Sequence, residues 1–471
     1  MDSNSPSRQR PSRQRQIRTR STAPRFLTPL LDVAAAVALL LLGALLISRP
    51  AHAQTDVHMD IQGKASMKSP LQLARFRGDG PVGSLPSQGR AIARKDFELS
   101  GVFLVGDVEP LEGKPVADPS MTGTVRVEGR VEQGASVSFF QFRGQAIDVG
   151  TGEIALDRTY PFTEASLRET MHRFADDVLE ALTGERGIAE TKMAYVRQDG
   201  RVKELWVMDY DGENARQVTH DRSLALSPTW APWGTELAFT TFKRGNPDLY
   251  LFDLTRGASY PFSTRPGLNT APNYSPDGKW VALTLSRDGN AEIYLVSRDA
   301  QTARRLTRNT VIDTSPSFSP TGREILFTSN RTGSPQVFVM DAEGLNQRLL
   351  TIEGSYNDSP QWSPKGDRIV YAARHDGIFD VIVMDATGSN PIQITSSAGH
   401  NENPHWSADG RKIVFSSSRD GKRQIFMMNA DGSDVVRLTG AGENFNPSWG
   451  PRPKSRLSVR GEVQGKPDGP G

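Results

Sequence analysis

The feature that most constrains this chain is a repeat in its second half, in which a proline stands two residues before an aromatic residue and a short turn follows. The six repeats read SPTWAPWG, APNYSPDG, SPSFSPTG, SPQWSPKG, NPHWSADG and NPSWGPRP. Successive aromatic residues stand 44 residues apart, and the last pair 43 apart, at Trp230, Tyr274, Phe318, Trp362, Trp406 and Trp449. Repeats of about 40–50 residues that each contain four short strand patterns are typical of a β-propeller.

Each repeat holds four strand-like segments, named A to D in chain order, with the aromatic residue on A. In the repeat that begins at Pro316, apolar and β-branched residues predict strand B over 324–330, strand C over 336–341 and strand D over 347–351. Turns of the Asp-x-x-Gly type separate strands C and D, because the Asp side chain bonds nearby amides and Gly accepts a positive φ.

The two ends of the repeat region are complementary. Six B segments occur, but the first, at 193–196, has no A segment before it, and the A segment around Trp449 has no B segment after it. We therefore predict a six-bladed β-propeller over residues 188–452. Its ring is closed by pairing of the C-terminal strand with the first blade, which leaves no exposed sheet edge.

Residues 1–53 have the features of a secretory signal peptide. Seven arginines lie in the first 25 residues, an uncharged apolar run extends from Val33 to Ile47, and Ala51-His-Ala53 supplies a cleavage site. We expect cleavage after Ala53 and an exported mature protein. The alternative is an uncleaved membrane anchor, although a helix that spans a bilayer needs about 20 apolar residues.

Composition limits the possible function classes. The chain has no cysteine, which excludes disulfides and lipid attachment through an N-terminal cysteine. The formal net charge of +2 arises from the basic leader, so the mature chain is mildly acidic and carries no sign of nucleic-acid binding. The tail over 453–471 is rich in Gly, Pro and charge, a composition that predicts disorder.

Residues 54–187 lack the repeat and mix two periodicities, which predicts a separate N-terminal α/β domain. Strand patterns occur at 56–61, 124–131 and 137–142, with a turn at 148–152. Apolar residues then follow helical spacing at Leu167, Met171, Phe174, Val178 and Leu182, and Gly184 stands at the end of this stripe.

The junction between the two parts resembles a known family. The segment RETMHRFADDVLEALTGERG (168–187), followed by TKMAYV (191–196), is similar to the domain junction of the TolB family, the periplasmic propeller proteins of the Tol-Pal envelope system. DFELSGVF (96–103) is similar to the end of that family's first helix, and the propeller repeats match its Pro-x-Trp-Ser-Pro-Asp-Gly units. The resemblance covers residues 54 to about 452.

The resemblance implies a non-enzymatic adaptor without cofactor or metal. Its implied role is to link TolA and inner-membrane Tol proteins to the lipoprotein Pal, for outer-membrane integrity and constriction during cell division. Other outer-membrane proteins are further possible partners, and no stable membrane insertion is expected after signal cleavage. The mature N-terminus would engage TolA through Gln54, Asp56, Val57, Met59 and Ile61. The loops between strand D and the next strand A would bind Pal at the propeller mouth, through Leu268, Asn269, Ala271, Asp313, Thr314, Asn357 and Asp358.

Several other signals have a structural and a functional interpretation. His400, Glu402 and His405 offer metal-ligand chemistry, but they span a loop and a strand, so polar surface residues explain them better. His172 is interpreted as a structural hydrogen-bonding residue rather than a catalytic one. The arginines that follow strand B are expected to tie blades together rather than to bind a ligand: Arg244, Arg287, Arg331, Arg374 and Arg419.

Two rival functions remain open at this point. A secreted propeller glycosidase or lyase would use channel-facing groups such as Asp313, Asp358, His400 and Glu402. A carbohydrate-binding surface protein is the other alternative. No Gly-x-Ser-x-Gly elbow and no phosphate-binding glycine loop before a helix occur in the sequence, so a propeller peptidase lacks its nucleophile.

The predicted cleavage of the leader can be tested by measuring the mass of the intact protein. We expect intact protein from the envelope fraction to have the mass of a chain that begins at Gln54, to carry no lipid and to need no detergent for extraction. A species that retains residues 33–47, or that is released only by detergent, would show that the apolar run is an anchor.

Overall fold

The computed structural model describes residues 68–134, 136–396 and 398–453. The expected signal peptide, the strand pattern at 56–61 and the five residues proposed to contact TolA lie outside these ranges. Among the helices of the described residues, none is long and apolar enough to cross a membrane.

The first part of the described chain is a mixed sheet with two helices. Its sheet has the order β3-β1-β4-β5-β6, with β2 paired to β4. Strand β1 runs parallel to β3 and β4, whereas β4, β5 and β6 form an antiparallel meander. The elements are β1 (Ser69–Ala74), β2 (Arg77–Asp79), α2 (Leu85–Ser100), β3 (Phe103–Val108), the 3-10 turn Pro119–Met121, β4 (Val125–Gln133), β5 (Phe140–Asp148), β6 (Ile154–Phe162), the 3-10 turn Glu164–Ser166 and α3 (Leu167–Thr183).

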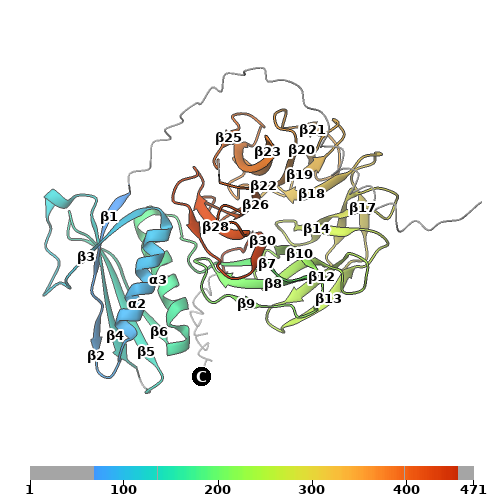
Figure 1. Cartoon of the computed structure of the whole chain (residues 1–471). Helices are drawn as coiled ribbons and strands as arrows, with labels where there is room; N and C mark the ends of the chain where they lie inside the picture. The colour runs from blue at the N-terminus through green and yellow to red at the C-terminus, as the bar shows by residue number, and fades with distance from the viewer. Residues whose placement is uncertain (1–67, 135, 397, 454–471) are drawn as a thin grey trace, which may run out of the picture. The chain divides into compact units, whose positions relative to one another are not determined.

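Helices α2 and α3 lie side by side on one face of this sheet (Figure 1). The apolar stripe predicted for α3 faces the sheet, and its central residue Phe174 contacts Phe97 of α2 and Phe142 of β5 edge-on. Gly184 ends α3 in the left-handed conformation, at φ 75°, which a residue with a side chain adopts less readily. The predicted helix and the predicted hairpin of β4 and β5 are both confirmed.

The second part is a six-bladed propeller, as predicted. Each blade is a four-stranded antiparallel sheet. Blade 1 contains β30 (Glu443–Trp449), β7 (Lys192–Asp199), β8 (Val202–Asp209) and β9 (Arg216–Gln217); blade 2 contains β10 (Ala225–Trp230), β11 (Glu236–Thr241), β12 (Asp248–Asp253) and β13 (Ala258–Ser263); blade 3 contains β14 (Asn269–Tyr274), β15 (Trp280–Leu285), β16 (Glu292–Ser297) and β17 (Ala303–Arg305). Blade 4 contains β18 (Asp313–Phe318), β19 (Glu324–Ser329), β20 (Gln336–Asp341) and β21 (Arg348–Leu349); blade 5 contains β22 (Asn357–Trp362), β23 (Arg368–His375), β24 (Ile378–Asp385) and β25 (Ile392–Gln393); blade 6 contains β26 (Asn401–Trp406), β27 (Lys412–Ser417), β28 (Gln424–Asn429) and β29 (Val436–Arg437).

The repeated aromatic residue ends the first strand of every blade and is buried in all six. Two of the indoles also bond across blades, because Trp230 Nε1 donates to the carbonyl of Ser448 and Trp406 Nε1 donates to that of Gln361. The aromatic residue of the repeat therefore packs the core and fixes neighbouring blades to each other.

A bulge explains the proline of the repeat. The register of each first strand shifts just before the aromatic end, and the residue before the proline has a positive φ, as in Ala271 at 50° and Asn403 at 53°. This strand is the inner edge of its blade, where a missing amide hydrogen removes no ladder bond. Proline is therefore tolerated there in every blade.

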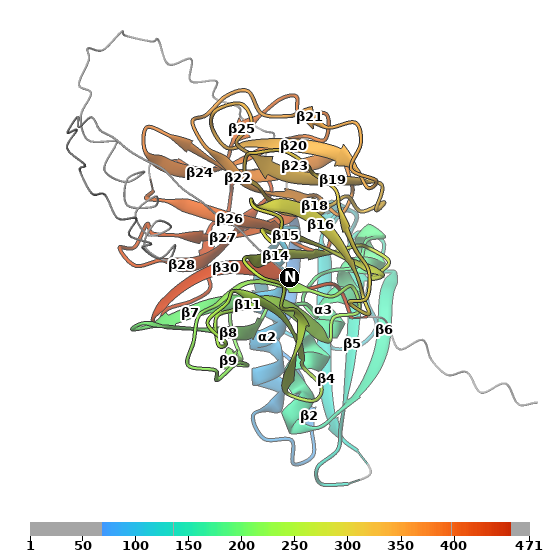
Figure 2. The same cartoon turned by 90° about the vertical axis from the view of Figure 1, so that its right-hand side faces the viewer.

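Strand β30 closes the ring by pairing antiparallel with β7. Figures 1 and 2 show β30 and β7 side by side, although they stand at opposite ends of the propeller sequence. Trp449 is opposite Met193, and its Nε1 donates to Thr191 Oγ1 at 2.8 Å, just before β7 begins. Beyond the strand, Arg452 donates to the carbonyls of Arg186 and Gly187.

Closure can be tested by truncation. A chain that stops at Gly442 lacks all of β30 and leaves β7 as an open edge, so we expect no soluble protein on expression. Truncation after Pro453 keeps β30 and is the matched control. Trp449→Ala in the full chain should lower the free energy of unfolding by about 3–5 kcal/mol. A Gly442 truncation that melts at the temperature of the control would contradict the closure.

Candidate functional site

The residues predicted to bind Pal do not lie in loops, with one exception. Leu268 precedes β14, but Asn269 and Ala271 lie within β14, Asp313 and Thr314 within β18, and Asn357 and Asp358 within β22. The first strand of each blade begins earlier than predicted, because its first residue is already paired with the second strand of the same blade, as Asn269 is with Leu285. The loop assignment was therefore wrong for six of the seven residues.

Three of these residues are also required by the fold, contrary to the expectation that they were free of it. Asn269, Asp313 and Asn357 have no exposed surface. Asn357 donates to Gln336 Oε1 and to the carbonyl of Glu353 at 2.6 Å, and Asp313 accepts from Asn309 and Arg331. Each side chain holds the connection that crosses from the outer strand of one blade to the inner strand of the next. Substituting any of them would disturb the blade itself.

Thr314 and Asp358 stand at the next position of their strands and link adjacent blades. Thr284 of blade 3 donates to Thr314, and Asp358 of blade 5 accepts from Ser315 and Thr328 of blade 4. Both residues remain half-buried, as Ala271 does, so part of each side chain faces the solvent. These three residues and Leu268 are the predicted positions that a partner could reach.

Beside Leu268, three exposed apolar residues at the same end of the blades were not predicted: Ile312, Ile352 and Ile378. The start of each inner strand pairs with the end of the second strand, so the connection before the inner strand and the hairpin after the second strand lie together. Leu268 is 40% exposed there, Ile312 54%, Ile352 87% and Ile378 41%. Leu268 and Ile312 both stand directly before the repeated Asn or Asp, so alignment of the repeats could have identified Ile312.

The other end of the central channel is lined by the repeat itself. A cavity of about 390 Å³ is bordered by the aromatic ends of the inner strands and by the prolines of the following turns, among them Pro232, Pro276, Pro320 and Pro364. A second cavity of about 110 Å³ lies at the bulges, between the serine, alanine or asparagine residues and the prolines. The lining is mainly neutral, and its titratable groups are Tyr274, His405 and Arg452.

The alternative metal and enzyme residues do not form a shared site. His400 Nδ1 accepts from the amide of Phe379, Glu402 pairs with Arg423, and His405 Nδ1 accepts from the amide of Trp449. Asp313 and Asp358 are held in blades 4 and 5 by the contacts given above. These side chains are committed to separate structural bonds.

Two of the arginines that follow the second strands, Arg331 and Arg419, make their side-chain hydrogen bonds within their own blades. Arg331 bonds Ser329 and Asp313 of its own blade and lies over the rings of Phe327 and Phe338. Arg419 repeats this arrangement with Ser417 and Asn401 in blade 6. For Arg331 and Arg419 the expectation that they tie blades together was wrong, because each guanidinium stacks on two aromatic rings of its own sheet. For Arg244, Arg287 and Arg374 it stays a prediction.

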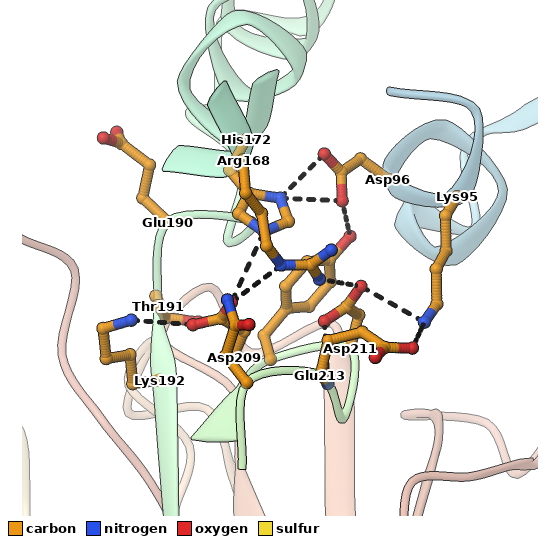
Figure 3. A network of polar contacts seen from close by, with 12 residues as sticks. Lys95, Asp96, Arg168, His172, Glu190, Thr191, Lys192, Asp209, Asp211 and Glu213 are labelled. Atoms are coloured by element: carbon orange, nitrogen blue, oxygen red, sulfur yellow. Dashed lines mark hydrogen bonds and ion pairs between the residues drawn. The ribbon is translucent and has the colours of Figure 1, made fainter. Parts of the chain in front are cut away.

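A buried polar network joins α2 and α3 to the first blade of the propeller (Figure 3). His172 of α3 contacts Asp96 of α2 through Nδ1 at 2.8 Å, and Tyr210, which follows β8, donates its hydroxyl to Asp96 at 2.9 Å. Arg168 of α3 donates to Asp209, the last residue of β8, and to Asp211, which follows the strand. His172 thus has the hydrogen-bonding role expected of it, although Asp96 was not identified as its partner.

Burial and charge shift the pKa values in this network. Burial lowers the pKa of His172, but the hydrogen bond and negative charge of Asp96 outweigh this and hold it above 6.5. Burial raises the pKa of Asp96, against the opposing effect of His172. For Asp209 and Asp211, burial is outweighed by hydrogen bonds from Lys192 and Arg168, so both pKa values are lowered.

His172, Asp209 and Asp211 lie close enough together to suggest a metal site. Their surroundings argue against one, because three cations already compensate the carboxylates. Arg168 bonds both, Lys192 Nζ lies 2.7 Å from Asp209, and Lys95 Nζ lies 3.3 Å from Asp211. A divalent cation would have to displace these groups from a buried position.

Comparison with known proteins was made by family, sequence and structure. The family model described as the TolB beta propeller domain matches residues 179–390 and 374–464. The chain is 34% identical over 243 residues to the Tol-Pal system protein TolB of Bordetella avium, covering 50% of this chain and 53% of that protein. It is also 34% identical over 236 residues to the protein of the same name from a Polaromonas species, with 47% and 52% covered. The chain thus spans about half the length of the curated relatives it matches.

The structural likeness extends further along the chain. The crystal structure of TolB from Acinetobacter baumannii superposes with a TM-score of 0.73 at 27% identity, covering 82% of this chain and 97% of that one. The superposition therefore includes residues before the propeller as well as the six blades. Since the family model spans more than half of the 471 residues, the chain belongs to the TolB β-propeller family.

Proposed function

We propose that this chain is the periplasmic TolB adaptor of a Tol-Pal envelope system, without enzymatic activity. In this role it links TolA and the inner-membrane Tol proteins to the lipoprotein Pal, and so supports outer-membrane integrity and constriction during cell division. The observation that carries the proposal is the structural likeness to a solved TolB over 97% of that chain. This likeness covers the α/β part together with the propeller, whereas many unrelated proteins share the propeller alone.

The geometry of the mouth favours a protein partner. Leu268 and Ile312 are exposed apolar residues on backbone that is held by bonds to the second strand, as Leu268 N to Ser286 Oγ and Ile312 N to Asn330 Oδ1. A rigid surface with apolar side chains loses little entropy when a partner binds. We assign the Pal surface to this end of the propeller, around Leu268, Ala271, Thr314 and Asp358.

The enzymatic and sugar-binding alternatives have less support. The carboxylates proposed for catalysis are either buried in blade structure, as Asp313, or paired with a neighbouring cation, as Glu402 with Arg423. A general acid and a general base need to approach one substrate bond together. The contacts of these side chains hold them apart in different blades.

The Pal surface can be tested at two positions whose side chains reach the solvent. We expect Leu268→Asp and Thr314→Arg each to weaken Pal binding at least tenfold, because one removes apolar contact and the other adds a bulky buried charge. Binding is measured by calorimetry beside the melting temperature of each variant.

Leu345→Asp is the matched control, since Leu345 is 64% exposed in the turn between β20 and β21, at the opposite end of its blade. Pal affinity should be unchanged in this variant. Unchanged affinity in both mouth variants would move the Pal surface elsewhere, first of all to the other mouth of the channel.

The TolA contact is assigned to the start of the mature chain. We expect deletion of residues 54–63 to reduce TolA binding in a pull-down by more than tenfold and to leave Pal binding within twofold of the intact protein. An equal loss of both partners would show that the segment supports the structure and is not a docking peptide.

A further inference from the structure

The contact between the α/β part and the propeller contains a histidine at its centre. His172 is 4% exposed and lies between α2, its own helix α3 and the segment after β8. Its ring packs edge-on against Tyr210 at 5.7 Å between centroids. Any change in the charge of this imidazole therefore occurs inside the junction of the two parts.

The hydrogen bonds around His172 indicate which of its ring nitrogens carries a hydrogen. As an ionised carboxylate, Asp96 accepts the hydroxyl of Tyr210 through one oxygen and a hydrogen from His172 Nδ1 through the other. His172 Nε2 is buried without a hydrogen-bond partner and lies 4.0 Å from Asp209 Oδ2. In a neutral ring this nitrogen would present a lone pair to a carboxylate, whereas in an imidazolium it presents a hydrogen.

The charged groups around the ring come from every element that packs there. Helix α2 contributes Lys95 and Asp96, and helix α3 contributes Arg168 and Asp176. The propeller contributes Lys192 from β7, Asp209 at the end of β8, and Asp211 and Glu213 after it, with Tyr210 as a further titratable group. Carboxylates outnumber the lysines and arginine in this set, so the protonated ring compensates negative charge.

We propose that His172 is a proton-operated latch between the α/β part and the propeller: as an imidazolium it holds Asp96 on one side and Asp209 on the other, and its deprotonation loosens the junction. The latch depends on the geometry of the junction and not on the identity of any partner. It adds regulation by pH to a contact that would otherwise be fixed.

The direction of the effect follows from linkage. Because the pKa of His172 is raised by its contact with Asp96, although burial acts against this, its contribution is fully present below about pH 6.5 and is lost as the pH rises through its pKa in the folded protein. Asp176 titrates in the same range, because burial raises its pKa to about 7. The test must therefore separate these two groups.

Because the chain has no cysteine, dyes attached to two introduced cysteines can report the distance between the α/β part and the propeller. Lys114→Cys in the α/β part and Lys422→Cys in the propeller are exposed labelling positions for a pair of pH-insensitive dyes on the mature chain. We expect a narrow distribution of energy transfer at pH 5.5–6.5 that broadens towards pH 9 with a midpoint above 6.5. A distribution that does not change over this range would overturn the proposal.

Three variants identify the titrating group that controls the distribution of energy transfer. His172→Gln should give the broad distribution at every pH, whereas His375→Gln, which alters an exposed histidine, and Asp176→Asn should keep the midpoint of the wild type. A wild-type profile in His172→Gln contradicts the latch, and so does loss of the transition in Asp176→Asn. If His172→Gln does not fold, Asp96→Asn decides: loss of the opposite charge should lower the midpoint by about 1–3 pH units, and an unchanged midpoint contradicts the latch.

Discussion

The pairing of β30 with β7 is the constraint on which the rest of the propeller depends. Every other blade is built from consecutive residues, but blade 1 joins residues from both ends of the region. Without this pairing, the buried face of β7 and the indole of Trp449 would lose their neighbours together. The ring needs no disulfide, because a closed circle of sheets gives each blade two packed faces and leaves only short edges.

The residues that close the ring also bond to the segment that follows α3, and in this way they connect the α/β part to the propeller. Trp449 bonds Thr191, and Arg452 bonds the carbonyls at 186 and 187, so the segment after α3 is held by the last residues of the propeller. The network around Asp96 and His172 lies directly beside this segment. The position of α3 relative to blade 1 therefore depends on packing at two neighbouring places.

Local patterns allowed most of the fold to be predicted. The spacing of the aromatic residues determined the number of blades, and the unpaired segments at both ends determined the closure. The stripe from Leu167 to Leu182 predicted α3 because its apolar spacing is visible without any tertiary information.

Contacts between distant residues could not be read in this way. Asn269, Asp313 and Asn357 look like polar loop residues in the sequence, yet each is buried by partners that come from another strand. Asp96 stands 76 residues before His172, and no periodicity connects them. The same limit explains the arginines after the second strands, whose stacking partners become visible only when the sheet is formed.

The route of the chain through blade 1 has a consequence for the order of folding. Residues 192–209 are made early and can form a hairpin of β7 and β8, but the inner strand of this blade is the last part of the propeller to be made. Five blades can assemble from local hairpins, which form within microseconds, while the first blade waits for a contact that spans some 250 residues of chain. The final strand therefore acts as a completion step, and until it docks the nascent protein exposes one sheet edge to chaperones and to other chains.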